Sequence, residues 1–187
     1  MSRQITNYCT NPSVETNATN WVQWGTPTIT RITTDAAVGS AALQVVTTSG
    51  GHGTTWSQLN FPAESGDTKH IIVRAKGSGS LRLDATVRDT GGSTVETVTP
   101  GSPVALIGDW QDIAWEVPVS HADAAWIRPM FLNTSAATYL LDAFGFLDEL
   151  HDYFDGDSPN AEWTGTPHAS TSILTIPDTA PRPPRGS

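Results

Sequence analysis

Tryptophan is the residue type in this sequence whose chemistry points most directly to a ligand. The chain has seven Trp but only three Tyr among its 187 residues. An aromatic ring stacks on the apolar face of a sugar, so exposed Trp side chains beside polar ones can hold a glycan. The alternative for each Trp is packing in the protein core. We expect core positions for Trp21, Trp110 and Trp115.

The binding candidates are Trp side chains in predicted strands, where successive side chains point to opposite faces of the sheet. Trp56 with Gln58, and Trp126 with Arg128, are each two positions apart, which places both members of a pair on one face of a strand. Trp24 is expected in a loop. Arginine and aspartate on a solvated strand face add hydrogen-bonding groups. The predicted carbohydrate-binding set is Trp24, Trp56, Gln58, Arg74, Arg82, Asp84, Trp126 and Arg128.

Patterns that would indicate catalysis are weak by comparison. The sequence has no Gly-x-Ser-x-Gly motif, its five His are scattered, and no His or Cys pair has the spacing of zinc ligands. Glycoside hydrolysis needs only two carboxylates across a cleft, and Asp84 and Glu116 are the candidates. Asp84 beside Arg82 is more simply interpreted as a surface ion pair. We therefore expect a protein that is not an enzyme.

The charge of the chain argues against two classes of partner. The formal net charge is -9, with 10 Lys and Arg against 19 Asp and Glu. A protein that binds a phosphate backbone or an anionic membrane surface needs a basic surface. The sequence also has no run of about 20 apolar residues that could span a bilayer. We expect neither nucleic acid binding nor membrane insertion.

The single cysteine, Cys9, bears on the compartment in which the chain is made. It cannot form an intramolecular disulfide, and the first residues lack the charged-then-apolar pattern of a secretory signal. We predict synthesis in a cytoplasm, with Cys9 as a buried structural thiol.

Short runs of alternating or β-branched residues, separated by Gly, Pro, Asn and Asp, recur through the first 147 residues. This spacing is typical of a β-sandwich or barrel. In one run Leu81 and Leu83 alternate with Arg82 and Asp84, so one face of that strand is solvated. The expected strands cover 5–10, 28–33, 41–47, 54–61, 70–76, 81–88, 94–98, 110–117, 126–132 and 138–147. The predicted fold is all-β, an antiparallel β-sandwich of the jelly-roll kind, with at most one helical turn at 120–125.

After residue 147 the sequence changes character. Five acidic residues crowd into 148–157, and 163–176 reads as a turn and a last strand. The proline-rich ending lacks the backbone donors to join a sheet. We predict a jelly-roll domain over 1–147, an acidic β appendix over 148–176 and an extended tail over 177–187.

Two motifs lie near the two ends of the predicted sandwich. Asn-Pro-Ser-Val-Glu at 11–15, followed by Trp21, is similar to the turn after the first strand of galactose-binding-like carbohydrate-binding modules, with Val14 in place of the usual aromatic residue. Tyr-Leu-Leu-Asp-Ala-Phe-Gly-Phe at 139–146 is similar to their last core strand. The resemblance implies a galactose-binding-like jelly roll. It also implies a structural calcium between Glu15 and Asp142, because related modules commonly hold one between these motifs.

A third motif lies in the appendix. Tyr-Phe-Asp-Gly-Asp-Ser-Pro at 153–159, continuing to Ala-Glu-Trp-Thr-Gly-Thr-Pro-His-Ala-Ser-Thr-Ser at 161–172, resembles a segment of minor tail proteins from phages that infect actinobacteria. This resemblance implies a virion protein, assembled in the host cytoplasm among other phage tail proteins. Its sandwich would contribute to tail-tip assembly and to adhesion to host cell-wall polysaccharide. The alternative is a purely structural virion subunit or decoration protein without glycan binding, and a homo-oligomer stays open.

Overall fold

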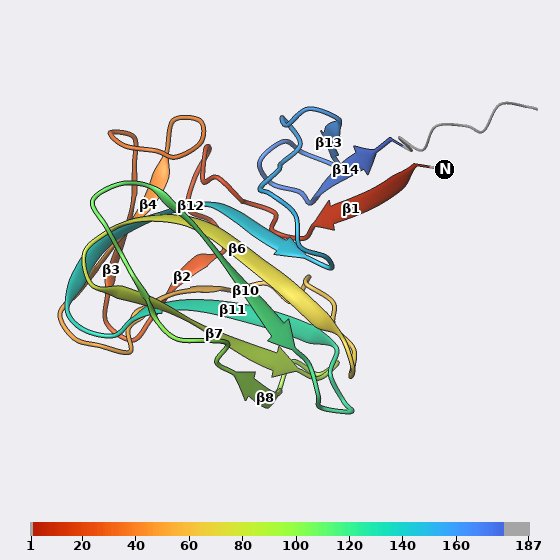
Figure 1. Cartoon of the computed structure of the whole chain (residues 1–187), viewed down its shortest axis with the longest axis horizontal. Helices are drawn as coiled ribbons and strands as arrows, with labels where there is room; N and C mark the ends of the chain where they lie inside the picture. The colour runs from red at the N-terminus through yellow and green to blue at the C-terminus, as the bar shows by residue number, and fades with distance from the viewer. Residues whose placement is uncertain (1, 178–187) are drawn as a thin grey trace, which may run out of the picture.

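The computed structural model describes residues 2–177, and all regular secondary structure in that range is β-strand (Figure 1). Fourteen strands in this range form three antiparallel sheets, two of which face each other as a sandwich. The predicted all-β sandwich is confirmed. Residues 120–125 contain a turn and no helix. No helix in residues 2–177 is long and apolar enough to cross a membrane.

One layer of the sandwich is a five-stranded sheet. Its strands follow the order β10 (Gln111–Pro118), β6 (Thr68–Gly77), β12 (Ala137–Leu147), β4 (Ala42–Thr47) and β3 (Thr28–Ile32). The register of β12 against β6 shifts between Asp142 and Gly145, and Ala143 has a φ of 53°. A bulge of this kind lets a strand turn a side chain away from its regular direction.

The other layer is a six-stranded sheet. Its strands follow the order β2 (Trp21–Trp24), β5 (Gly53–Trp56), β11 (Trp126–Asn133), β7 (Ser80–Arg88) and β8 (Thr94–Val98), with β9 (Val104–Ala105) paired to β7. β7 alternates as predicted: Leu81, Leu83, Ala85 and Val87 lie in the core between the sheets. Aromatic rings fill the centre of this core, where the ring centroids of Trp21 and Phe144 lie 3.9 Å apart.

The third sheet joins the two ends of the described chain. It contains β1 (Arg3–Asn7), β14 (Ser172–Ile176) and β13 (Ala161–Trp163), and Figure 1 shows it beside the end of β12. The expected first strand of the sandwich therefore pairs with the appendix instead. A small core of Ile5, Ile72, Leu147, Phe154 and Leu174 holds this sheet against β6 and β12. The tail predicted at 177–187 lies outside the described residues beyond Pro177.

Asn7 connects the third sheet to the sandwich. Its buried side-chain amide donates to the carbonyl oxygens of Phe144 and Phe154, both at 3.0 Å. Its Oδ1 accepts from the backbone N–H groups of Cys9 and Phe146, both at 3.1 Å. The Asn side chain thereby satisfies all of its donors and acceptors in the interior. Cys9 beside it is fully buried, and burial raises the pKa of its thiol, as expected of a structural cysteine.

Candidate functional site

The outward side of the six-stranded sheet gathers most of the predicted binding residues. Directly opposed residues of antiparallel strands share a face, so the register of β2, β5, β11, β7 and β8 defines rows across this side. The rows are Trp24–Gly53–Leu132–Arg82, Val22–Thr55–Met130–Asp84, Arg128–Thr86–Thr97 and Trp126–Arg88. We call this surface the arginine face. It brings together Trp24, Arg82, Asp84, Trp126 and Arg128 of the predicted set.

The accessible groups of the arginine face lie around a closely packed middle. Thr55, Met130 and Leu132 are almost fully buried. Trp24 at one end is 43% exposed, and Trp126 in the row at the other end is partly exposed. Aromatic surface is therefore available at both ends of the face.

Asp84 is the acidic group of the arginine face, and it is held in a fixed position. The side chain of Arg82 donates to it at 2.8 Å, and the hydroxyl of Thr99 donates to its other oxygen at 2.8 Å. The residue is only 9% exposed, so its carboxylate depends on these two donors. The predicted ion pair between Arg82 and Asp84 is present.

Arg88 and Arg128 have fewer partners. Arg88 Nη1 donates to the carbonyl of Gly92 at 2.8 Å, and its buried Nε has no hydrogen-bond partner among the described residues. Arg128 Nε donates to the carbonyl of Trp56. Burial, and then the neighbouring charge of Arg88, lower the pKa of Arg128. Sequence reasoning missed Arg88, although it continues the alternation of Arg82, Asp84 and Thr86.

Three expectations about individual side chains are wrong. Trp56 is completely buried: it pairs with inward Trp21 across β2 and β5, so it lies in the core and cannot stack on a ligand. Trp110, expected in the core, is partly exposed and donates from its indole to Asp35 at 3.0 Å. Trp24 ends strand β2 instead of lying in a loop.

The other Trp expectations and Gln58 have simpler outcomes. Trp21 and Trp115 lie in the core as predicted. Gln58 is exposed beyond the end of β5, where its amide donates to the Asn20 side chain at 2.8 Å. Gln58 therefore links the segment after β5 to the segment before β2, and it does not belong to the arginine face.

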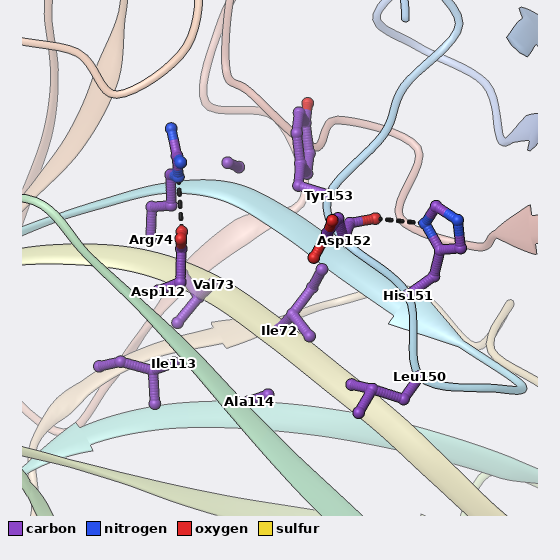
Figure 2. Close-up of a pocket in the computed structure, with 11 residues that line it drawn as sticks. Ile72, Val73, Arg74, Asp112, Ile113, Ala114, Leu150, His151, Asp152 and Tyr153 are labelled. Atoms are coloured by element: carbon purple, nitrogen blue, oxygen red, sulfur yellow. Dashed lines mark hydrogen bonds and ion pairs between the residues drawn. The ribbon is translucent and has the colours of Figure 1, made fainter. Parts of the chain in front are cut away.

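The remaining predicted residue, Arg74, lies on the opposite side of the sandwich. It borders a groove of about 710 Å³ between the five-stranded sheet and the segment after β12 (Figure 2). The groove is lined by Ile72, Val73, Arg74, Asp112, Ile113, Ala114, Ala143, Leu150, His151, Asp152 and Tyr153. We call it the Tyr153 groove. Its volume lies in the range of small-molecule sites.

Three polar side chains of the Tyr153 groove, Arg74, His151 and Tyr153, have partners in the protein. Arg74 donates to Asp112 at 2.6 Å, which raises the pKa of Arg74. The Tyr153 hydroxyl donates to Asp155 at 2.8 Å, and burial raises the pKa of this tyrosine. His151 Nδ1 lies 2.9 Å from the carbonyl oxygen of Asp152. The lining also contains exposed aliphatic surface, since Leu150 is 60% exposed.

Glu15 and Asp142 bind the same loop, residues 37–41. Asp142 Oδ2 accepts from the backbone N–H groups of Ala37 and Val38 at 2.8 and 2.9 Å. The carboxylate of Glu15 accepts from the N–H groups of Ser40 and Ala41, at 3.0 and 3.1 Å, and from the Ser40 hydroxyl. One carboxylate from each of the two predicted motifs therefore holds this loop in place.

Burial controls the pKa of Asp142. Asp142 is fully buried, and burial raises its pKa to about 7, with a smaller contribution in the same direction from the charge of Glu15. Backbone N–H donors act in the opposite direction. Within residues 2–177 no three His, Cys, Asp or Glu side chains are placed to hold a metal together. A calcium ion here would have two carboxylates and would take its other oxygens from backbone carbonyls or water.

The two carboxylates considered for hydrolysis do not meet. Asp84 points outward from the six-stranded sheet, on the arginine face. Glu116 is exposed on β10 of the five-stranded sheet, between inward Trp115 and Val117. They lie on opposite outer sides of the sandwich, so they cannot act across one cleft.

Comparison with solved structures defines the type of sandwich. The xylan-binding CBM22-1 domain of Xyn10C from Paenibacillus barcinonensis has a TM-score of 0.62 and 19% identity, covering 75% of this chain and 94% of the domain. The CBM22-1–GH10 modules of Xyn10B from Clostridium thermocellum, complexed with xylohexaose, have a TM-score of 0.60 and 17% identity, covering 73% and 27%. These likenesses show a carbohydrate-binding-module-like jelly roll.

A phage protein contains a similar fold. The enzymatically active domain of tailspike protein 4 from bacteriophage CBA120 has a TM-score of 0.60 and 17% identity, and the match covers 75% of this chain and 21% of that one. No family model matches the sequence. No curated protein matches it either.

Proposed function

We propose that this chain is a non-catalytic carbohydrate-binding module and that the arginine face is its glycan-binding surface. The observation that carries the proposal is the convergence of five predicted residues, from strands far apart in sequence, on one face. Trp24 and Trp126 offer rings for stacking on sugars, Asp84 is a fixed acceptor, and the arginines are donors.

The spacing of the rows favours an extended ligand. Neighbouring rows lie two residues apart along a strand, or about 7 Å, so the Trp24 and Trp126 rows are separated by about 20 Å. A single sugar ring cannot contact both. We therefore infer a polysaccharide or a long oligosaccharide as the ligand. The similar xylan-binding modules support this class of ligand without identifying the sugar.

We further propose that the module belongs to a phage tail, as a minor tail protein located in the virion. The proposal rests on the appendix motif and on the similar fold within a phage tailspike. Part of the motif forms β13 of the third sheet. The Trp163 indole donates to Asp157 at 3.1 Å in the preceding turn and packs over Gly156, where a Cβ would collide with the ring. Host cell-wall polysaccharide would be the ligand, and other tail proteins would be the partners.

Pull-down with purified wall polysaccharide from an actinobacterial host tests the glycan-binding proposal. The variants Trp24→Ala and Trp126→Ala should each lower the bound fraction at least about 10-fold, since each removes one stacking platform. The matched control is Trp110→Ala, which removes another partly exposed Trp outside the arginine face. Equal loss in all three variants would contradict the proposal. Absence of binding by the wild type, with normal incorporation into particles, would favour the purely structural subunit.

We also propose that Glu15 and Asp142 hold a structural calcium. The charge of Glu15 raises the pKa of Asp142, so the two carboxylates are near enough to repel each other, and a cation between them would relieve that repulsion. Thermal melting during a calcium titration tests this: the midpoint should rise with calcium and fall with EDTA. A melting midpoint that changes with neither calcium nor EDTA would contradict the calcium proposal.

A further inference from the structure

We infer that the arginine face recognises an acidic glycan, with an oxyanion substituent bound between Arg88 and Arg128 beside Trp126. This inference rests on the proposed glycan-binding function and adds the chemical class of its ligand. Carboxylate, sulfate and phosphate groups share the chemistry required.

The distribution of charge in this acidic protein singles out the two arginines. Residues 2–177 contain eight Lys and Arg. Five of them form ion pairs with Asp or Glu: Arg3, Lys69, Arg74, Lys76 and Arg82. A sixth, Arg31, is held by the carbonyl oxygens of Val14 and Glu15. Arg88 and Arg128 are the remaining two, and each has one carbonyl partner within the described residues.

The register places these two cations next to each other. Arg88 lies opposite Trp126, and Arg128 follows two residues after Trp126 on the same strand, β11. The arginines are thus diagonal neighbours on one face, about 7 Å apart at their backbones. Figure 1 shows β7 and β11 side by side in this layer. Two like charges at this distance repel each other, and an anion between them would remove that cost.

The available donors match an oxyanion. A guanidinium carries five N–H donors in a planar fork that fits a carboxylate, sulfate or phosphate with two parallel hydrogen bonds. Each of these arginines uses one donor internally, and the Nε of Arg88 is buried, so the terminal guanidinium nitrogens supply the donors for a ligand. Trp126 in the same row offers a ring to the sugar that carries the acid. Neutral sugar hydroxyls alone would leave both cations without a counter-charge.

Calorimetric titration with matched ligands tests the inference on the full chain. Oligogalacturonate is compared with its carboxyl-reduced neutral form, and a sulfated oligosaccharide and poly(glycerol phosphate) distinguish the source of the anion. Wild type should bind at least one anionic ligand about 10-fold more tightly than the neutral one, and this preference should weaken as salt rises. The variants Arg88→Gln and Arg128→Gln should lose the preference.

Controls separate this inference from the function on which it rests. Arg74→Gln removes a cation from the opposite side of the sandwich and should keep the preference. Arg88→Lys retains charge but loses the fork, so it should recover part of the affinity and report a folded site. Equal affinity for charged and neutral glycans, unchanged in Arg88→Gln, would overturn the inference while leaving glycan binding intact. No binding to any polysaccharide would overturn both.

Discussion

The two outer sides of this sandwich differ in surface shape and in how many of their polar groups already have partners. The Tyr153 groove encloses about 710 Å³ of space, yet Arg74 pairs with Asp112 and Tyr153 pairs with Asp155. The arginine face is built on a packed sheet, yet Arg88 and Arg128 keep most of their donors unused by the described residues. A binding surface is therefore indicated by groups that still need a partner, and not by hollow volume alone.

The largest expected effect concerns Asp142, which lies opposite Arg74 of the Tyr153 groove in the register of β12 and β6. Its pKa is raised from 3.8 to about 7 in the folded protein, so the folded state binds more protons than the unfolded state between these values. The contribution of Asp142 to the free energy of unfolding should therefore fall as pH rises from 4 to 7 and stay low above 7. At about 1.4 kcal/mol per pKa unit, the change is at most about 4 kcal/mol.

Denaturant unfolding of wild type and Asp142→Asn across pH 4–8, in EDTA, measures this contribution. The difference between the two proteins isolates Asp142 from the other titrating groups. Added calcium should stabilise wild type more at pH 8 than at pH 5, because the ion requires the ionised carboxylate. A pH-independent difference between wild type and variant would contradict the raised pKa.

A second prediction removes the support of the groove without touching the arginine face. Asn7→Ala deletes four buried hydrogen bonds that join β1, β12 and the segment at Phe154, and leaves backbone groups unpaired. We expect a loss of about 3 kcal/mol in unfolding free energy. Hydrogen exchange should show faster exchange in β1, β13 and β14 than in β7 and β11.

Glycan binding by Asn7→Ala tests which of the two surfaces holds the ligand. Below the melting temperature Asn7→Ala should bind polysaccharide as wild type does, because Trp24, Trp126 and the arginines lie on the other layer. A parallel loss of binding would place the ligand in the Tyr153 groove instead of on the arginine face.

The sequence predicted which side chains of a strand point into the core better than it predicted which strands pair. Alternation along 81–88 correctly separated Leu81 and Leu83 from Arg82 and Asp84, because period-2 patterning acts within one strand. The same argument failed for Trp56, because all four residues of β5 are buried and alternation along it does not distinguish the core from the outward face. Gln58 lies beyond the end of β5, so alternation from Trp56 does not fix the direction of its side chain.

Features that depend on pairing between strands far apart in the sequence could not be predicted from local sequence patterns. The pairing of β1 with β14 joins residues about 170 positions apart, and local patterns carry no information on such a pairing. The neighbourhood of Arg88 and Arg128 requires the register of β7 against β11. Glu15 and Asp142 were paired through the family resemblance, and in the structure both side chains accept hydrogen bonds from the 37–41 loop.

The smallest expected effects compare one ion pair from each side. Arg74→Gln breaks an exposed pair whose Asp112 side chain is 77% accessible, so stability should change by less than about 0.5 kcal/mol. Arg82→Gln leaves the nearly buried Asp84 carboxylate with Thr99 alone, and should cost about 1 to 2 kcal/mol. Chemical denaturation of both variants measures the difference. Equal costs would mean that Asp84 is well hydrated, and the arginine face would then lack its fixed acceptor.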